Sequence, residues 1–232
     1  MKLLCGIFFV LLMACKPPAV WGFESVRAQE INECRPGEAV SWGDGQDRAV
    51  ADAALVFLYD ATAAPEGFSP ELVAGMVKKS ALAWSLCGLA TRVLTAREQD
   101  AGALHGVIRI QWNEPASGGN FGLANLGQRT LSLGPAAFAL LKQRNPAHDA
   151  RETLQMVISH EMGHFYGLLA HSRRCVDVLS YYQNAKGERC NSRDASQMRY
   201  FTEYRHILPT ACDIERCRKV NGLPPLTAAH PR

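Results

Sequence analysis

The pattern of apolar and polar positions in the first part of the chain predicts a strand followed by a long helix. An apolar run within residues 49–59, ending in Ala-Leu-Val-Phe-Leu-Tyr, has the length and composition of a buried strand. Ser69 followed by Pro70 is typical of a helix start, with serine as the N-cap and proline in the first turn. Apolar residues recur from there at near-helical spacing to about Leu94, with Trp84 on the inner side of an amphipathic helix.

Short strands are expected in the middle of the chain. Residues 107–112 alternate in part between apolar and polar side chains and predict a strand. Residues 118–122 are rich in glycine and predict a loop, and residues 130–133 predict a second short strand that Gly134-Pro135 ends. Residues 24–46, before the first strand, are expected to be irregular.

Two more helices are predicted in the second half of the chain. Asn145-Pro146 has the cap-and-proline pattern of a helix start, a broad apolar stripe follows from 150 to 165, and Gly167 is a natural stop. Asp194 caps a third helix that Pro209 ends. The part of the chain beyond it is expected to be poor in helices, and residues 222–232 to form a loose tail.

The composition is that of a globular protein with a real core. Of the 232 residues, 47% are apolar and 20% are charged, which is compatible with one domain or two small ones. The formal net charge is +3 and no block of lysine and arginine occurs, so a nucleic acid is a poor candidate for a partner.

The first 22 residues are expected to be a signal peptide rather than part of the fold. Lys2 supplies a short positive region, and residues 3–13 form an apolar run too short to span a bilayer. Residues 12–15, Leu-Met-Ala-Cys, resemble a bacterial lipobox, which would place a lipid anchor on Cys15, and ordinary cleavage before Glu24 is the alternative. Because no second long apolar run follows, we expect a mature protein without a spanning segment, either secreted, periplasmic or anchored to the outer membrane as a lipoprotein.

The cysteine content also favours export. Of the eight cysteines, Cys5 falls within the leader and Cys15 is either removed or acylated, which leaves an even six. Six cysteines in an exported domain indicate three disulfides, for which fifteen connectivities exist. Zinc ligation is disfavoured because no Cys-x-x-Cys pair occurs. We expect the pairs Cys175–Cys190, Cys34–Cys87 and Cys212–Cys217, the last with a turn between its members.

A candidate metal site lies in the second predicted helix. His160 and His164 stand four residues apart, so both imidazoles project from one face of the helix toward one point. Two neutral imidazoles supply half of the tetrahedral nitrogen set that Zn²⁺ prefers. Glu161 follows the first histidine directly, and its carboxylate is placed to take a proton from a water that the metal has acidified. A surface helix with these residues by chance is the alternative.

Residues 160–172 as a whole, HEMGHFYGLLAHS, resemble the signature of the metzincin clan of zinc peptidases, H-E-x-x-H-x-x-G-x-x-H. Gly167 matches the clan's glycine, and Gly163 with the His-Ser ending is most similar to the matrixins. The third histidine of the clan lies ten residues after the first, whereas His171 lies eleven residues after it. Ala170, which cannot bind a metal, occupies the clan's position.

The resemblance implies His171 as the third ligand, provided that the turn absorbs the extra residue as a bulge. Deletion of Ala170 is then expected to be tolerated. Asp177 is the nearest alternative ligand, and His148 and His105 lack a suitable spacing.

Metzincins also carry a methionine in a tight turn beneath the metal. Residues 178–181 lie at a matrixin-like interval after the third histidine and have Leu179 at the methionine position. Leucine has a volume similar to that of methionine, so it would preserve the hydrophobic floor that the methionine forms beneath the metal. Met198 lies in a stretch that resembles the astacin turn, but inside a predicted helix, so Leu179 is favoured. The resemblance places Tyr181 beside the metal as a stabiliser of the oxyanion, and aromatic core packing is an equally good account of it.

The resemblance implies an α+β fold like that of a metzincin catalytic domain, spanning residues 24–221. This fold has a small twisted mixed sheet, a long early helix, an active-site helix and a helix-containing C-terminal subdomain, here with disulfides added. The strand at 130–133 would be the sheet edge that binds a peptide by β-augmentation.

The implied function is that of an exported zinc endopeptidase acting on protein or peptide substrates, with Glu161 as general base. The ligands would be His160, His164 and His171. The alternative is a zinc-containing envelope or surface binding protein that has lost proteolysis, which the shifted histidine and the missing methionine suggest and the retained Glu161 argues against. A domain without metal would require the signature to be a coincidence.

Overall fold

The computed structural model describes residues 25–94 and 106–226 of the chain. The predicted leader, Cys5, Cys15 and His105 lie outside these residues. A five-stranded mixed sheet has the order β2-β1-β3-β5-β4, in which β4 pairs antiparallel with β5 and the other neighbours are parallel. The strands are β1 (Leu55–Asp60), β2 (Thr91–Leu94), β3 (Val107–Trp112), β4 (Gly122–Asn125) and β5 (Thr130–Leu133).

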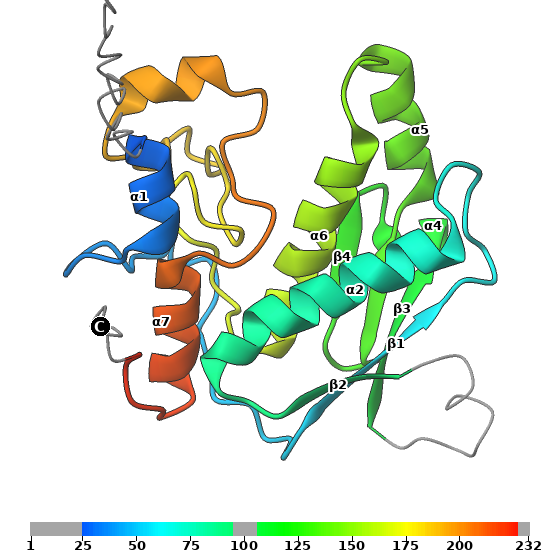
Figure 1. Cartoon of the computed structure of the whole chain (residues 1–232), viewed down its shortest axis with the longest axis horizontal. Coiled ribbons are helices and arrows are strands. Elements are labelled where there is room, and N and C mark those ends of the chain that lie inside the picture. Colours follow the sequence, from blue (N-terminus) through cyan, green and yellow to red (C-terminus); the bar gives the residue numbers. More distant parts are fainter. Residues whose placement is uncertain (1–24, 95–105, 227–232) are drawn as a thin grey trace, which may run out of the picture.

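Two long helices, α2 (Pro70–Trp84) and α6 (Ala150–Phe165), pack against each other on the same side of the sheet (Figure 1). The side chains of Trp84, Phe57 and Ile158 are fully buried in the core that they share with the strands. Trp84 Nε1 donates to the backbone oxygen of Ser159 at 2.9 Å, so a buried polar group of each helix is satisfied by the other.

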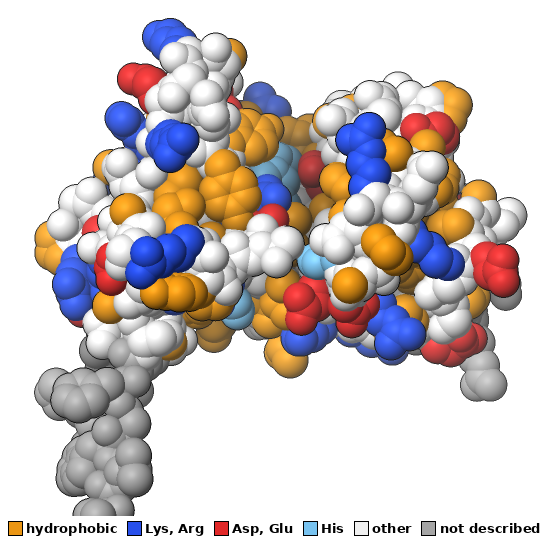
Figure 2. Space-filling view, turned by 90° about the horizontal axis from the view of Figure 1, so that it is seen from above, with side chains coloured by type: hydrophobic (Ala, Val, Ile, Leu, Met, Phe, Trp, Pro, Cys, Tyr) orange, Lys and Arg blue, Asp and Glu red, His pale blue; other side chains and the backbone are white. Residues whose placement is uncertain are grey.

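A second lobe lies beside the sheet and carries three further helical elements (Figure 1). It contains α1 (Val26–Asn32), the 3-10 helix η2 (Ala195–Tyr200), α7 (Ala211–Val220) and long loops between 167 and 210. The short α4 (Glu114–Ser117) and α5 (Pro135–Arg144) belong to the sheet side. Figure 2 shows a hollow between the two lobes with histidine side chains inside it. Among the described residues, no helix is both long and apolar enough to cross a membrane.

The strands at 107–112 and 130–133 are confirmed, but two predicted helices differ from the structure. α2 begins at Pro70 with the Ser69 cap as expected, and ends ten residues earlier than Leu94, through a 3-10 turn at Ser85–Cys87 and Gly88 at φ +93°. The apolar residues after that glycine form β2 and pair with β1, so their near-helical spacing was a coincidence. α6 begins at Ala150 with Asp149 as its cap.

Several helical elements were missed or misjudged. Asn145 ends α5 instead of beginning α6, and α5 escaped prediction because its one strongly buried side chain, Phe138, sets up no apolar stripe. Asp194 does cap a helix, but a 3-10 helix that stops at Tyr200. α1 lies in the stretch 24–46 that was expected to be irregular, and α7 lies in the part expected to be poor in helices. α7 begins with a capping box in which Thr210 and Asp213 satisfy each other's backbone N–H groups, a signal present in the sequence.

The sheet edge also differs from the expected one. The strand at 130–133 is an inner strand, because the chain before it folds back as β4 and covers its outer side. The edge next to α6 is therefore β4, which begins at Gly122 within the stretch predicted as a loop.

The described residues contain three disulfides, and Cys175–Cys190 is confirmed. The other two expected pairs are wrong. Cys34 bonds to Cys212 and Cys87 bonds to Cys217. Cys212 and Cys217 both lie on α7, where a spacing of five turns their side chains to different faces, so each meets a different partner.

Candidate metal centre

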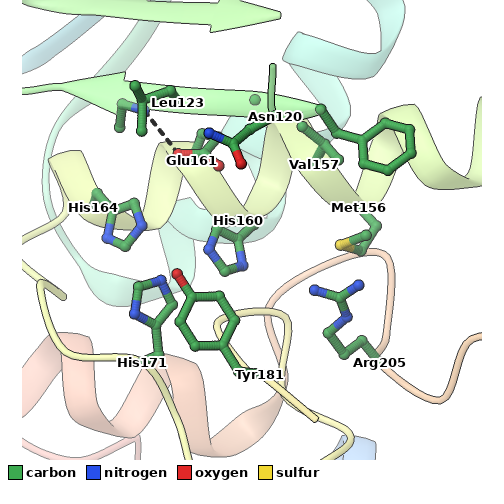
Figure 3. Close-up of a pocket in the computed structure, with 13 residues that line it drawn as sticks. Asn120, Leu123, Met156, Val157, His160, Glu161, His164, His171, Tyr181 and Arg205 are labelled. Carbon is green, nitrogen blue, oxygen red and sulfur yellow. Dashed lines mark hydrogen bonds between the residues drawn. The ribbon is translucent and has the colours of Figure 1, made fainter. Parts of the chain in front are cut away.

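Helix α6 presents His160, Glu161 and His164 to the hollow between the lobes (Figure 3). His160 and Glu161 are 6% and 8% exposed. The helix packs closely against Trp84 and against Leu179, whose Cδ2 would lie 2.6 Å from a Cβ at Gly163. Glycine at that position is therefore required by the close packing of the helix against its neighbours.

The helix ends in a Schellman motif centred on Gly167, which has φ +95°. Leu168 N–H donates to the oxygen of Gly163 at 3.3 Å, and Gly167 N–H donates to the oxygen of His164 at 3.1 Å. A Cβ at Gly167 would also lie 2.3 Å from the oxygen of Arg48. The chain thus reverses where the sequence predicted, and only glycine satisfies both the backbone angle and the close approach.

The reversed chain brings His171 to the two helical histidines. The ring centroids of His160, His164 and His171 are 5.1 to 5.2 Å apart, and their potential ligand atoms all lie within 4.8 Å of one another. Ala170, which occupies the clan's third-histidine position in the sequence, is buried. Its backbone N–H donates to Asp47, and its backbone oxygen accepts from Arg216. The extra residue is accommodated in the turn, and the displaced histidine still reaches the group.

Each of the three imidazoles is oriented by an acceptor at Nδ1. His160 Nδ1 lies 2.7 Å from the oxygen of Val178, and His164 Nδ1 lies 2.7 Å from the oxygen of Leu168. A carbonyl oxygen can only accept, so Nδ1 carries the proton in the neutral ring and Nε2 keeps its lone pair. His171 has a different acceptor, a carboxylate oxygen of Asp44 at 2.7 Å from its Nδ1.

Burial keeps these rings neutral. Together with the neighbouring imidazoles, burial lowers the pKa of His160 well below its ordinary value and that of His164 to about 4. Burial also lowers the pKa of His171, although Asp44 opposes the shift. Three neutral imidazoles with inward lone pairs are a donor set that fits Zn²⁺, which takes nitrogen ligands and leaves a fourth position open in hydrolytic sites.

Glu161 is held at the boundary between the helix and the edge strand. Its Oε2 accepts a 2.8 Å hydrogen bond from the N–H of Ala124 on β4 (Figure 3). A Cβ at Gly122 would lie 2.5 Å from Val157 Cγ1 and 2.9 Å from Glu161 Cγ, so a glycine is needed for β4 to approach. Burial raises the pKa of Glu161 to about 7, and the Ala124 hydrogen bond opposes this shift.

These residues line a cavity of about 310 Å³ that Tyr181 and Arg205 also border. The ring of Tyr181 stacks on His171 with a centroid distance of 3.7 Å, and its hydroxyl points toward the histidine group (Figure 3). Burial raises the pKa of Tyr181, so its hydroxyl is protonated at neutral pH and can donate a hydrogen bond. Core packing does not describe this tyrosine, since 41% of it is exposed.

Leu179 and Met198, the two candidates for the hydrophobic floor beneath the metal, lie in different places. Leu179 is fully buried beneath α6, in a turn closed by the hydrogen bond from Ser180 N–H to the oxygen of Asp177. Met198 belongs to η2 and packs against a separate cluster around Cys175. The position expected for the clan's methionine is thus occupied by leucine.

The alternative ligands are engaged elsewhere. Asp177 is fully buried and accepts hydrogen bonds from Ser172, Arg174 and Thr210, away from the histidines. His148 Nε2 lies 2.7 Å from the hydroxyl of Thr153 at the start of α6.

Three residues of the site were not predicted from the sequence. Asp44 and Arg205 are far from the signature in sequence, and no motif marks either of them. Gly122 could have been found only from the Gly-rich stretch at 118–122, where glycine permits a close approach of the backbone.

No protein-family model matches the chain, and no curated protein matches it. Among solved structures, the chain is similar to one described as the GM1 bound form of the ECX AB5 holotoxin, with 13% sequence identity and a TM-score of 0.43. This match covers 73% of the present chain and 80% of that chain. A likeness of this size carries no argument about fold or activity, so the candidate site depends on the geometry of its own residues.

Proposed function

We propose that the protein is an exported zinc-dependent endopeptidase of the metzincin type. The proposal is supported by one observation: three neutral imidazoles lie together beside the buried carboxylate of Glu161, which would not be one of the ligands. His160, His164 and His171 would hold the metal. A metal site with a purely structural role has no use for Glu161, whereas a hydrolytic site requires a base beside the metal.

Different residues of the site would carry out different steps of the hydrolysis. When bound, a zinc ion polarises a substrate carbonyl and acidifies a water. Glu161 accepts the proton of the attacking water on its carboxylate and delivers it to the leaving amine nitrogen. Tyr181 is placed to donate a hydrogen bond to the oxygen on which negative charge develops.

The edge strand β4 supplies a place for an extended peptide. It borders the cavity on the side opposite the histidine loop, and Leu123 on this strand is 42% exposed. A peptide laid along β4 by β-augmentation would pass its backbone in front of Glu161, since Ala124 is bonded to that residue. Three disulfides support an oxidising compartment and therefore the export that the leader predicts.

The test combines metal content with casein hydrolysis by the purified protein. We expect one zinc per chain and hydrolysis that Glu161→Gln reduces by about 10² to 10⁴, with zinc retained, because the amide cannot accept a proton. Glu152→Gln, on an exposed turn of the same helix, is the matched control and should behave as the wild type. Zinc without hydrolysis would instead indicate a surface binding protein that has lost proteolysis, and a protein that binds no zinc would overturn the proposal.

A further inference from the structure

The third histidine is carried by a turn that lies against a remote segment of the chain. Residues 40–48, which we call the N-terminal arm, run beside residues 167–173, which contain the extra residue of the signature. Backbone and carboxylate groups pair along the whole contact. The hydrogen bonds run from Arg48 N to Gly167 O (3.0 Å), Ala170 N to Asp47 Oδ1 (3.0 Å), His171 N to Asp44 Oδ1 (2.9 Å), Trp42 N to His171 O (3.0 Å) and Arg173 N to Val40 O (2.9 Å).

Asp44 binds His171 in two ways at once. Its Oδ1 accepts from the backbone N–H of His171, and its Oδ2 lies 2.7 Å from the ring Nδ1. The carboxylate thereby fixes both the backbone and the ring orientation of one residue. His160 and His164 need no such partner, because backbone carbonyl oxygens hold their Nδ1 atoms.

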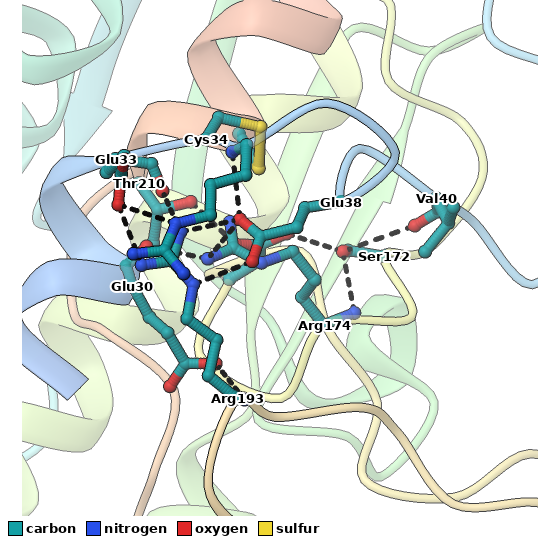
Figure 4. A network of polar contacts seen from close by, with 12 residues as sticks. Glu30, Glu33, Cys34, Glu38, Val40, Ser172, Arg174, Arg193 and Thr210 are labelled. Carbon is teal, nitrogen blue, oxygen red and sulfur yellow. Dashed lines mark hydrogen bonds and ion pairs between the residues drawn. A yellow bond between two sulfur atoms is a disulfide. The ribbon is translucent and has the colours of Figure 1, made fainter. Parts of the chain in front are cut away.

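The N-terminal arm is itself attached at both ends to the second lobe. The disulfide Cys34–Cys212 joins the chain before it to α7, and Asp47 at its far end pairs with Arg216 of the same helix at 2.7 Å. Between these points Glu38 pairs with Arg193 at 2.6 Å (Figure 4). The arm therefore presents Asp44 from a fixed support.

From this geometry we infer that Asp44 is a positioning residue of the metal centre and that the N-terminal arm is what lets a histidine displaced by one residue serve as a ligand. The inference rests on the proposed zinc site. A carboxylate on the Nδ1–H of a ligating histidine fixes the tautomer and the orientation of the ring and makes Nε2 a better donor, and removing such a partner typically weakens metal binding by about 10- to 100-fold.

The experiment measures the zinc affinity of the full chain by competition with a chelator, and the stability of each variant without metal. Asp44→Asn offers one acceptor and one donor to two N–H donors of His171, so one contact becomes unfavourable. We expect it to bind zinc at least tenfold more weakly. Asp52→Asn is the matched control, because Asp52 forms a 2.9 Å ion pair with Arg129 just after the arm and does not border the histidine cavity.

A double-mutant cycle separates positioning from general support of the fold. If Asp44 acts through His171, Asp44→Asn should have no further effect on zinc affinity in a His171→Ala background. An equal effect in both backgrounds would overturn the inference, as would an affinity of Asp44→Asn within threefold of the wild type, even if its metal-free stability falls. Should Asp44→Asn fail to fold, Asp44→Glu, which keeps the charge but moves the carboxylate by one methylene, is held to the same tenfold criterion. A wild type that binds no zinc would overturn the proposed function together with the inference, whereas the other outcomes leave the proposed function standing.

Discussion

The candidate centre is built from two halves that are held in different ways. One half is the helix α6, which carries His160, Glu161 and His164 within five residues. The other half is the loop after Gly167, which carries His171 and Tyr181. Both halves present buried or half-buried rings to the same cavity.

The difference lies in the distance along the chain from which each half receives its support. Leu168, four residues further along, orients His164, and Val178 orients His160. His171 depends on Asp44, which is 127 residues away. The partners of the two helical histidines therefore lie within 18 residues of them, whereas the loop half is complete only with the docked N-terminal arm. The residues that carry the chemistry are therefore close together in the sequence, whereas a distant segment fixes the position of the third histidine.

The largest expected effect concerns the ligands themselves. His164→Ala and His171→Ala should each weaken zinc binding by several orders of magnitude, because each removes one of three protein ligands. Asp177→Ala should leave zinc affinity within about tenfold of the wild type, yet cost about 3 to 5 kcal/mol of unfolding free energy, because it removes the nearer of the two carboxylates that pair with the buried Arg174. The same change leaves the hydroxyls of Ser172 and Thr210 without their buried acceptor. Chelator competition and urea unfolding of the three variants measure both quantities. An unchanged affinity in His171→Ala would mean that the loop half is no part of the centre.

The two disulfides of the second lobe test how firmly the N-terminal arm is attached. Cys34–Cys212 closes a separation of 178 residues and Cys175–Cys190 one of 15. The chain-entropy relation assigns about 5 kcal/mol to the first and about 3 kcal/mol to the second. Replacing each pair with alanines should therefore lower the unfolding free energy more for Cys34–Cys212, as urea titration can measure. Equal losses would show that the length of the closed loop does not set the contribution of the Cys34–Cys212 disulfide.

The helix half of the site could be predicted from the sequence because its geometry follows from residue spacing. A separation of four places two histidines on one face, and Gly167 marks a helix end that no other residue could form. The strands at 107–112 and 130–133 could also be predicted from the sequence, since they alternate or carry apolar runs between turn residues.

The loop half and the lobe behind it could not be predicted, because their partners are chosen by tertiary packing. No sequence motif around Asp44 predicts its contact with His171, which lies 127 residues later. The disulfide partners of Cys212 and Cys217 depend on which faces of α7 meet the chain before the arm and the 3-10 turn after α2. Even α2 was predicted too long, since residues after Gly88 that have helical spacing pair with β1 instead.

A smaller effect is expected when Ala170 is deleted, a change that the sequence alone suggested would be tolerated. Ala170 is 2% exposed, its N–H donates to Asp47 and its oxygen accepts from Arg216 at 2.8 Å. Deletion would shift His171 out of the register that Asp44 holds, so we expect zinc binding to weaken by about 10- to 100-fold, as when the partner of a ligand is lost. Ala170→Gly keeps the backbone bonds and is the control. A deletion variant with wild-type affinity would show that the turn, rather than the N-terminal arm, places the histidine.

The smallest expected effect is a pH dependence of stability that belongs to the attachment of the N-terminal arm. Arg193 binds the carboxylate of Glu38, and with the Arg35 backbone N–H and Arg174 it lowers the pKa of Glu38 from its ordinary 4.5 to about 2 (Figure 4). Glu33 shares Arg193, and its pKa is lowered as well.

The unfolded chain therefore binds the proton of Glu38 more readily than the folded one between these two pH values. The stabilisation by Glu38 is complete above about pH 4.5 and is lost as the pH falls toward 2. Between pH 6 and pH 3, Glu38→Gln should therefore lose about 1 kcal/mol less unfolding free energy than the wild type, after allowance for screening by solvent. Urea midpoints at the two pH values and low salt measure this difference. Glu215→Gln, on the exposed side of α7, should follow the wild type at both pH values. If Glu38→Gln loses as much stability on acidification as the wild type does, the ion pairs of Glu38 contribute nothing measurable. The attachment of the arm must then come from the disulfide, from the Asp47–Arg216 ion pair and from the pairing of residues 40–48 with 167–173.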